Sequence, residues 1–121
     1  MQIKKTKLKG LRIVSNKIYK DKRGHFKEDF KSAFFKGSNF IFSCTSKSKK
    51  NVLRGFHFQS KFMQAKLINV LKGKILDCVV DLRKSSKTFG KSFSIILSEK
   101  NSLSLYILIH SLPKGSIFFP T

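Results

Sequence analysis

The stretch LINVLKGKILDCVVDL, residues 67–82, decides the fold class, because apolar residues fill most of two short runs on either side of a glycine. Valine, isoleucine and leucine favour strands, and helical periodicity is weak in both runs. Gly73 can adopt the positive φ that a tight turn between strands requires. The pattern predicts a β-hairpin that turns at residues 71–74.

The same short-strand pattern recurs along the chain. Apolar and polar residues alternate in short windows, and clusters of Gly or of Ser, Lys and Asn separate these windows, which is typical of an all-β sandwich or barrel. A short helical turn is expected within residues 31–37. Strands are expected at residues 11–14, 25–30, 40–44, 52–58, 66–71, 75–82, 93–97 and 103–109.

Composition indicates one folded domain with a strongly basic surface. The 121 residues are 40% hydrophobic and include 13 Phe, which excludes wholesale disorder. The net charge of +20 suggests an anionic partner. However, the basic residues are mostly lysines scattered along the whole chain, which favours a lysine-biased composition over a nucleic-acid interface. A basic nucleic-acid-binding protein therefore stays as an alternative, and a surface that attracts phosphorylated substrates is expected under either interpretation.

Cysteine spacing and the N-terminal segment bear on metal sites and location. Cys44 and Cys78 form no CxxC pair and have no histidine at metal-ligand spacing, so neither a zinc site nor a disulfide framework is expected. The basic start leads into no apolar signal region, and the longest apolar stretch, around residues 105–109, is too short to span a bilayer. We expect a cytoplasmic protein with no membrane association.

The segment VLRGFHFQ, residues 52–59, places Arg54 and His57 in a β-rich run. A histidine can take and return a proton at neutral pH, although a hydrogen-bonded core histidine is the plainer interpretation. Residues three apart lie on opposite faces of a regular strand. If both side chains serve one pocket, Gly55 is expected to mark a bulge that re-aims one of them.

Three further charged residues are candidates. Lys66 begins an expected strand and shares a face with Ile68 and Val70, although it can equally be a solvated lysine at a strand end. Arg23 and Glu28 bracket a glycine turn and the start of a strand. The plainer interpretation of these two is an exposed ion pair that contributes little stability.

Three collinear segments carry a family resemblance: DKRGHFKEDF (21–30), SKSKKNVLRGFHFQ (46–59) and QAKLINVLKGKILDCVVDLRKSSKTFG (64–90). Their order and spacing resemble the dTDP-4-dehydrorhamnose 3,5-epimerases over roughly residues 2–106. The resemblance implies a cupin-type jelly-roll β-sandwich in a single domain, residues 1–121. It also implies an isomerase that acts on a dTDP-4-keto-6-deoxy sugar in dTDP-rhamnose biosynthesis.

The resemblance also implies roles for the candidate residues. His57 matches the base that abstracts the protons at C3 and C5 beside the C4 ketone. Lys66 matches the cation near the C4 oxygen, where enolate charge develops, and Arg54 matches a substrate-binding position. Arg23 and Glu28 match residues that engage the nucleotide across a homodimer interface. The chemistry needs no cofactor and no metal.

Two departures from the family pattern affect these implications. Phe42 and Cys44 stand where the family usually has Gln and Asn, which puts nucleotide contacts from that segment in doubt. After about residue 107 the resemblance is lost, so residues 108–121 are expected to be a non-matching tail produced by a frameshift or truncation. The family's proton-donating Tyr and base-orienting Asp would lie beyond it. Activity in this form is left open, and a sugar-nucleotide 3,4-ketoisomerase of the same fold is the nearest alternative.

Overall fold

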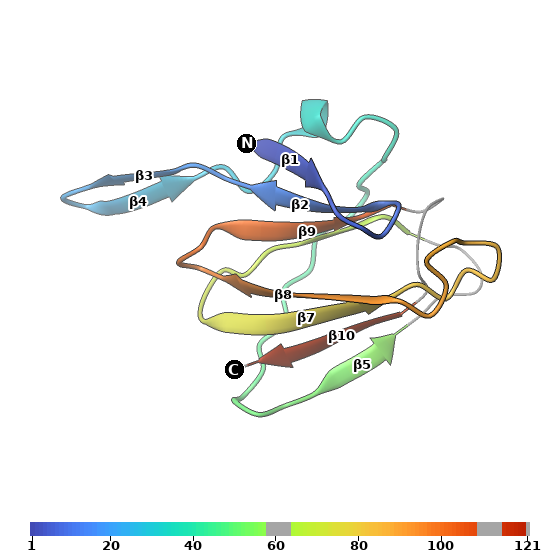
Figure 1. Ribbon diagram of the computed structural model, residues 1–121. Helices are drawn as coiled ribbons and strands as arrows, with labels where there is room; N and C mark the ends of the chain where they lie inside the picture. The colour runs from blue at the N-terminus through green and yellow to red at the C-terminus, as the bar shows by residue number, and fades with distance from the viewer. Residues whose placement is uncertain (58–63, 109–114, 121) are drawn as a thin grey trace.

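The chain folds as two four-stranded antiparallel sheets and a separate two-stranded arm (Figure 1). The computed structural model describes residues 1–57, 64–108 and 115–120. The two four-stranded sheets enclose the larger of two apolar clusters. The prediction of an all-β jelly-roll sandwich is confirmed.

The first sheet has the strand order β1-β2-β9-β6. Its strands are β1 (Gln2–Lys5), β2 (Leu11–Ser15), β9 (Leu103–Ile107) and β6 (Lys66–Ile68). The second sheet has the order β5-β10-β7-β8. Its strands are β5 (Arg54–His57), β10 (Gly115–Pro120), β7 (Lys74–Val80) and β8 (Ser92–Ser98).

The main core lies between the inner faces of the two sheets. Its buried members come from both sheets and from the adjoining segments: Leu8, Leu11, Val70, Val79, Leu97, Leu105 and Ile107. Strand alternation directs these side chains to one face, and each fully buried leucine contributes roughly 1.5–3 kcal/mol relative to exposure. On β8, strand alternation puts Phe93, Ile95 and Leu97 on the inner face, where all three belong to this cluster or pack against it.

A second cluster covers the outer face of the first sheet. Val14, Phe35 and Tyr106 are buried there, and the rings of Phe35 and Tyr106 meet edge to face with centroids 4.9 Å apart. The hydroxyl groups of Ser38 and Tyr106 are hydrogen-bonded to each other. Phe35 follows the 3₁₀ helix η1 (Ser32–Phe34), which confirms the predicted helical turn.

The arm consists of β3 (Ile18–Asp21) and β4 (Gly24–Lys27), which pair with each other and with no other described strand. It projects from one end of the sandwich (Figure 1). Its apolar side chains are largely solvent-exposed, with Tyr19 at 54% and Phe26 at 67% of their full accessible surface. The arm therefore adds little to the core.

The hairpin predicted at residues 67–82 is wrong. β6 pairs with β9 in the first sheet, whereas β7 pairs with β8 and β10 in the second. Gly73 does adopt a positive φ of 80°, but the turn carries the chain from one sheet to the other. The two runs do not pair because the segment between them crosses from one sheet to the other. Val70 in this segment is 8% exposed and packs into the main core between the sheets.

Other expected strands need smaller corrections. Residues 40–44 form no strand, and β1, β3 and β10 were not predicted. The expected ends at residues 58 and 109 lie outside the described residues. β10 falls within the stretch expected to be a tail, yet its backbone lies between β5 and β7 in the second sheet. Residues 109–114 and 121 of that stretch lie outside the described residues.

Candidate active site

The strand β5 contains the irregularity that was expected at Gly55. Along β10, positions 116 and 118 pair with His57 and Arg54, so two residue steps on β10 face three steps on β5. Gly55 has a φ of 128°, which few residues with a side chain adopt. The predicted bulge is confirmed, and it brings Arg54 and His57 to the same face of the strand.

That face is the inner face of the sandwich. Positions 116 and 118 of β10 also pair with Val79 and Asp77 on β7. Residues directly opposite one another on neighbouring strands project to the same side of a sheet. Since Val79 belongs to the main core, His57 and Arg54 stand on the core side of the second sheet, on its edge strand.

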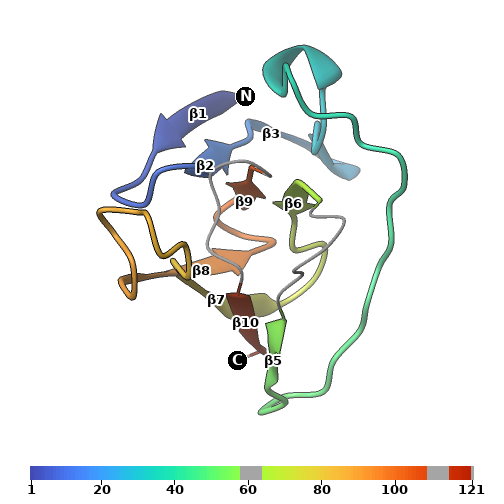
Figure 2. The same cartoon turned by 90° about the vertical axis from the view of Figure 1, so that its right-hand side faces the viewer.

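Lys66 approaches from the opposite sheet. It pairs with Ile107, and its strand neighbour Ile68 packs against the main core, so Lys66 also stands on an inner face. This confirms the predicted shared face of Lys66, Ile68 and the core residue Val70. In the end-on view, β6 lies at the edge of the upper sheet and β5 at the edge of the lower sheet on the same side (Figure 2). His57 ends β5 and Lys66 begins β6.

Arg54 is oriented by the segment that precedes β5. Its Nε donates a hydrogen bond to Ser48 Oγ at 2.7 Å, and its Nη2 donates to the carbonyl oxygen of Lys47 at 3.3 Å. These bonds hold the exposed guanidinium at the open edge of the second sheet. A guanidinium exposed at this edge is suited to bind an anionic group.

A fourth ionisable residue on these inner faces was missed by sequence reasoning. Asp77 is 0% exposed, and neither of its carboxylate oxygens has a hydrogen-bond partner in the described part of the chain. Burial among apolar side chains raises the pKa of Asp77 from 3.8 to about 7. In the sequence, Asp77 shares one face of β7 with Ile75 and Val79, which could have indicated a buried carboxyl group. Because the other face of β7 is apolar as well, the sequence alone does not show which face is buried.

Asp81 is buried for a different reason, because it organises the loop after β7. Its carboxylate accepts hydrogen bonds from Arg83 Nη2, Ser86 Oγ and Thr88 Oγ1, each at 2.6 Å. The Arg83 guanidinium is the main cause that holds the pKa of Asp81 well below its usual range. The polar run DLRKSSKT therefore has a structural role, because its side chains form hydrogen bonds that fix the loop at the end of the sandwich where β7 finishes.

Arg23 lies on the arm and Glu28 directly after it. Both lie away from His57, Arg54 and Lys66, the three residues that form the inner-face group. The Arg23 side chain is 91% exposed and pairs with Asp21 at 2.6 Å, not with Glu28. That pairing lowers the pKa of Asp21. The structure therefore puts His57, Arg54 and Lys66 on the facing inner sides of the two sheets, and Arg23 and Glu28 on or directly after the arm. Their nucleotide-binding role stays a prediction, as do the roles of the other three residues.

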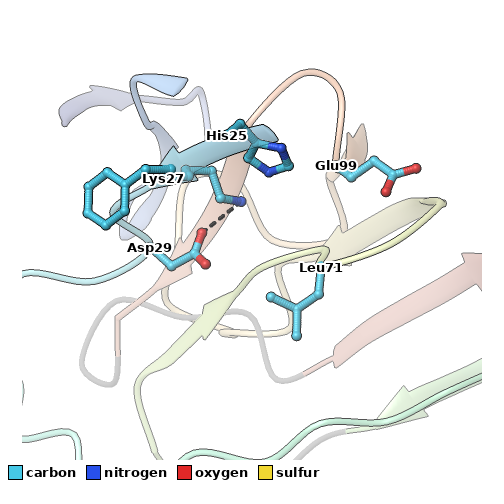
Figure 3. Close-up of a pocket in the computed structure, with 6 residues that line it drawn as sticks. His25, Lys27, Asp29, Leu71 and Glu99 are labelled. Carbon is cyan, nitrogen blue, oxygen red and sulfur yellow. Dashed lines mark ion pairs between the residues drawn. The ribbon is translucent and has the colours of Figure 1, made fainter. Parts of the chain in front are cut away.

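A surface cavity of about 280 Å³ lies where the arm meets the turns of the sandwich (Figure 3). Its walls come from the arm, the β6–β7 turn and the β8–β9 turn, and comprise His25, Phe26, Lys27, Asp29, Leu71 and Glu99. Lys27 and Asp29 form an ion pair of 2.7 Å within it. None of the five predicted site residues lines this cavity, so it is separate from the inner-face group.

The inner-face group suits proton transfer next to a carbonyl group. An imidazole can remove a proton from carbon, and an ammonium ion placed nearby can stabilise the enolate oxygen that results. Within residues 1–57, 64–108 and 115–120, no three His, Cys, Asp or Glu side chains gather as a metal site. No helix in the described part of the chain is long and apolar enough to cross a membrane.

Comparisons with known proteins find relatives over most of the chain. Residues 5–111 match the family model described as dTDP-4-dehydrorhamnose 3,5-epimerase. A protein of that name from Methanothermobacter thermautotrophicus is 40% identical over 107 residues, which are 85% of this chain and 58% of the relative. One from Shigella flexneri is 38% identical over 113 residues, covering 88% of this chain and 62% of the relative.

A solved structure also matches. The dTDP-6-deoxy-D-glucose-3,5-epimerase of Legionella pneumophila, crystallised with dTDP-4-keto-L-rhamnose, superposes with a TM-score of 0.90 at 35% identity. The match covers 98% of this chain and 64% of that one. The chain thus spans about three fifths of the length of these relatives.

Proposed function

We propose, from the premise that the chain belongs to the dTDP-4-dehydrorhamnose 3,5-epimerase family, that it serves the 3,5-epimerisation of a dTDP-4-keto-6-deoxy sugar. The supporting observation is the bulge at Gly55, which puts His57 and Arg54 on the inner face that Lys66 approaches from the other sheet. This reaction requires neither a dinucleotide cofactor nor a metal ion. The pathway is then dTDP-rhamnose biosynthesis, a source of sugar for polysaccharides.

In this proposal His57 acts as the base. It removes the proton at C3 or C5, both of which are acidified by the C4 ketone, and the electrons move onto the C4 oxygen. Lys66 carries a positive charge on the facing sheet and stabilises that oxygen as it becomes negative. His57 keeps the proton it has removed, and a proton donor on the opposite side of the sugar, the role that the family resemblance gives to a tyrosine outside the matching residues, protonates the carbon from that side, so the C4 ketone re-forms and the centre is inverted.

The remaining residues serve binding. Arg54 lies at the open edge, where a guanidinium suits the diphosphate or the sugar oxygens. Arg23 lies on the projecting arm and Glu28 directly after it, and in this proposal the two residues bind the nucleotide of a substrate held by a second copy of the chain. The homodimer and a cytoplasmic location are part of the proposal.

Deuterium exchange tests the proposal directly. The protein is incubated in D₂O with dTDP-4-keto-6-deoxyglucose, and NMR follows label at C3 and C5. Exchange at both carbons is expected, and His57→Asn should slow it by about 10²–10⁴-fold. His25→Asn, a change at a histidine outside the inner-face group, is the matched control and should keep the wild-type rate.

Two results would count against the proposal. Exchange at C3 without C5 would favour a 3,4-ketoisomerase, because that reaction does not touch C5. Equal exchange by wild type and His57→Asn would show that another group removes the proton. Tight binding of nucleic acid at physiological salt, with no binding of the sugar nucleotide, would favour the nucleic-acid alternative.

A further inference from the structure

The side chain that the proposed reaction leaves unused is Asp77. A carboxyl group with no exposure and no hydrogen-bond partner in the described part of the chain is costly to retain. Asp81, four residues later and equally buried, has five hydrogen bonds to its oxygens, so this strand is able to satisfy a carboxylate where the loop provides donors. Asp77 is therefore a buried carboxyl group on β7 to which the described residues donate no hydrogen bond.

The inner faces around Asp77 offer few candidates for that partner. The inner-face residues of β2, β8 and β9 are uncharged. The ionisable side chains on the inner faces of the described strands β1, β2 and β5 to β9 are Lys4, Arg54, His57, Lys66 and Asp77. Asp77 is thus the acidic residue among four basic ones.

Lys66 is the basic residue that can pair with Asp77. Lys4, Arg54 and His57 are exposed, whereas Lys66 is partly buried. Arg54 is also engaged by Ser48 and by the carbonyl oxygen of Lys47 at the sheet edge. Lys66 has no ion pair or hydrogen bond from its ammonium group to any described residue, and it projects from the facing sheet. Packed sheets lie about 10 Å apart, a distance that the flexible four-carbon stem of a lysine can largely cross.

We propose that Asp77 is a positioning residue for Lys66: its carboxylate receives the Lys66 ammonium when a sugar nucleotide fills the space between the sheets. Bound sugar displaces water from the ammonium, and a desolvated cation needs a counter-charge. The resulting ion pair holds the ammonium beside the C4 oxygen. The inference rests on the proposed function, in which Lys66 stabilises that oxygen.

The pairing has a measurable consequence, because it requires Asp77 to be ionised. The free carboxyl is largely protonated at pH 6.5, since burial raises its pKa to about 7. Binding of dTDP-glucose at pH 6.5 should then release most of one proton from Asp77, roughly three quarters by simple titration. Calorimetry in two buffers of different ionisation enthalpy measures this number directly. At pH 8.5 the carboxyl is already ionised, and the release should disappear.

Three variants test whether the released proton comes from Asp77. Asp77→Asn and Lys66→Met should each remove the release at pH 6.5, because each lacks one member of the pair. Ile95→Val, a packing change at the position that pairs with Asp77 across β8, should keep it. In the exchange reaction, Asp77→Asn should lower kcat by about a hundredfold while the KM stays near wild type, as expected for a misplaced catalytic group. Asp77→Glu should restore part of the rate.

The outcomes for the two proposals are distinct. If dTDP-glucose binds and Asp77→Asn releases as many protons as wild type, the assignment of Asp77 is overturned and the epimerase proposal stands. The same holds if the release persists in Lys66→Met. If the chain binds neither dTDP-glucose nor the keto sugar, the proposed function fails and the assignment of Asp77 fails with it.

Discussion

Replacing Asp77 by asparagine should stabilise the ligand-free protein at neutral and alkaline pH. The side chain lies fully buried on the inner face of β7, with core residues Val79 and Ile75 on the same face. Asparagine has nearly the same shape as aspartate and cannot become charged. The substitution therefore removes an ionisation cost and leaves the packing of the core almost unchanged.

The magnitude follows from the pKa of Asp77. Burial raises it from 3.8 in the unfolded chain to about 7 in the folded protein. Between these values the unfolded state loses its proton while the folded state keeps it, so stability falls as the pH rises and is level above about pH 7. The difference corresponds to about 4 kcal/mol, because each pKa unit is worth about 1.4 kcal/mol.

Urea unfolding of wild type and Asp77→Asn at pH 4 and pH 8 measures this effect. The stability difference between the two proteins should change by about 4 kcal/mol in favour of the variant, which moves the urea midpoint by more than about 1 M. Asp21→Asn is the matched control at an exposed carboxyl whose pKa is lowered by Arg23, and it should not gain stability at pH 8. A difference that is constant between pH 4 and pH 8 would refute the reasoning, since it would mean that Asp77 ionises without cost.

Two further substitutions test local structure. Asp81→Asn should destabilise the protein by about 3 kcal/mol at pH 7, because it breaks a buried charge-assisted cluster. The pKa of Asp81 is below its usual range, so this contribution is present above pH 4 and shrinks as the pH falls further; urea unfolding at pH 7 and pH 3 should show the difference narrowing. Gly73→Ala should cost about 1 kcal/mol at a φ of 80°, although no atom lies within 4 Å of the added methyl group. Lys72→Ala in the same turn is its control, and equal stability of the two variants would contradict the assignment to backbone conformation.

Local sequence patterns were sufficient to predict where several strands lie, because this does not depend on which strands pair. β7, β8 and β9 were predicted within one or two residues at each end where both are described, because each is rich in apolar residues that favour strands. Pairing was a different matter. The hairpin at residues 67–82 was the most explicit prediction and it failed, because the choice of partner depends on Val70 entering the core and not on the turn sequence. β1 and β3 are four-residue strands that are mostly exposed, too short for an alternating pattern to stand out, and were missed for that reason.

The candidate site divides in the same way. His57, Lys66 and Arg54 were identified through a family resemblance, since neither exposure nor spacing distinguishes a catalytic histidine from a structural one. Asp77 stands in the same matching segment and was overlooked, because an acidic residue within an apolar strand becomes informative only when its face and its partners are known. Sequence supplied the residue types, and the register of the sheets supplied the shared face.

The bulge at Gly55 shows how a single backbone irregularity determines the composition of this face. Without the extra residue, β5 would pair in regular register, and Arg54 and His57 would project to opposite sides. Only one of the two side chains, His57 or Arg54, would then share a face with Asp77 and Val79, and the other would point outward. With the bulge, both side chains stand across β10 from Asp77 and Val79. A substitution such as Gly55→Val, which disfavours a φ of 128°, should therefore impair exchange activity more than stability, because it re-aims the base relative to Lys66 while the main core is untouched.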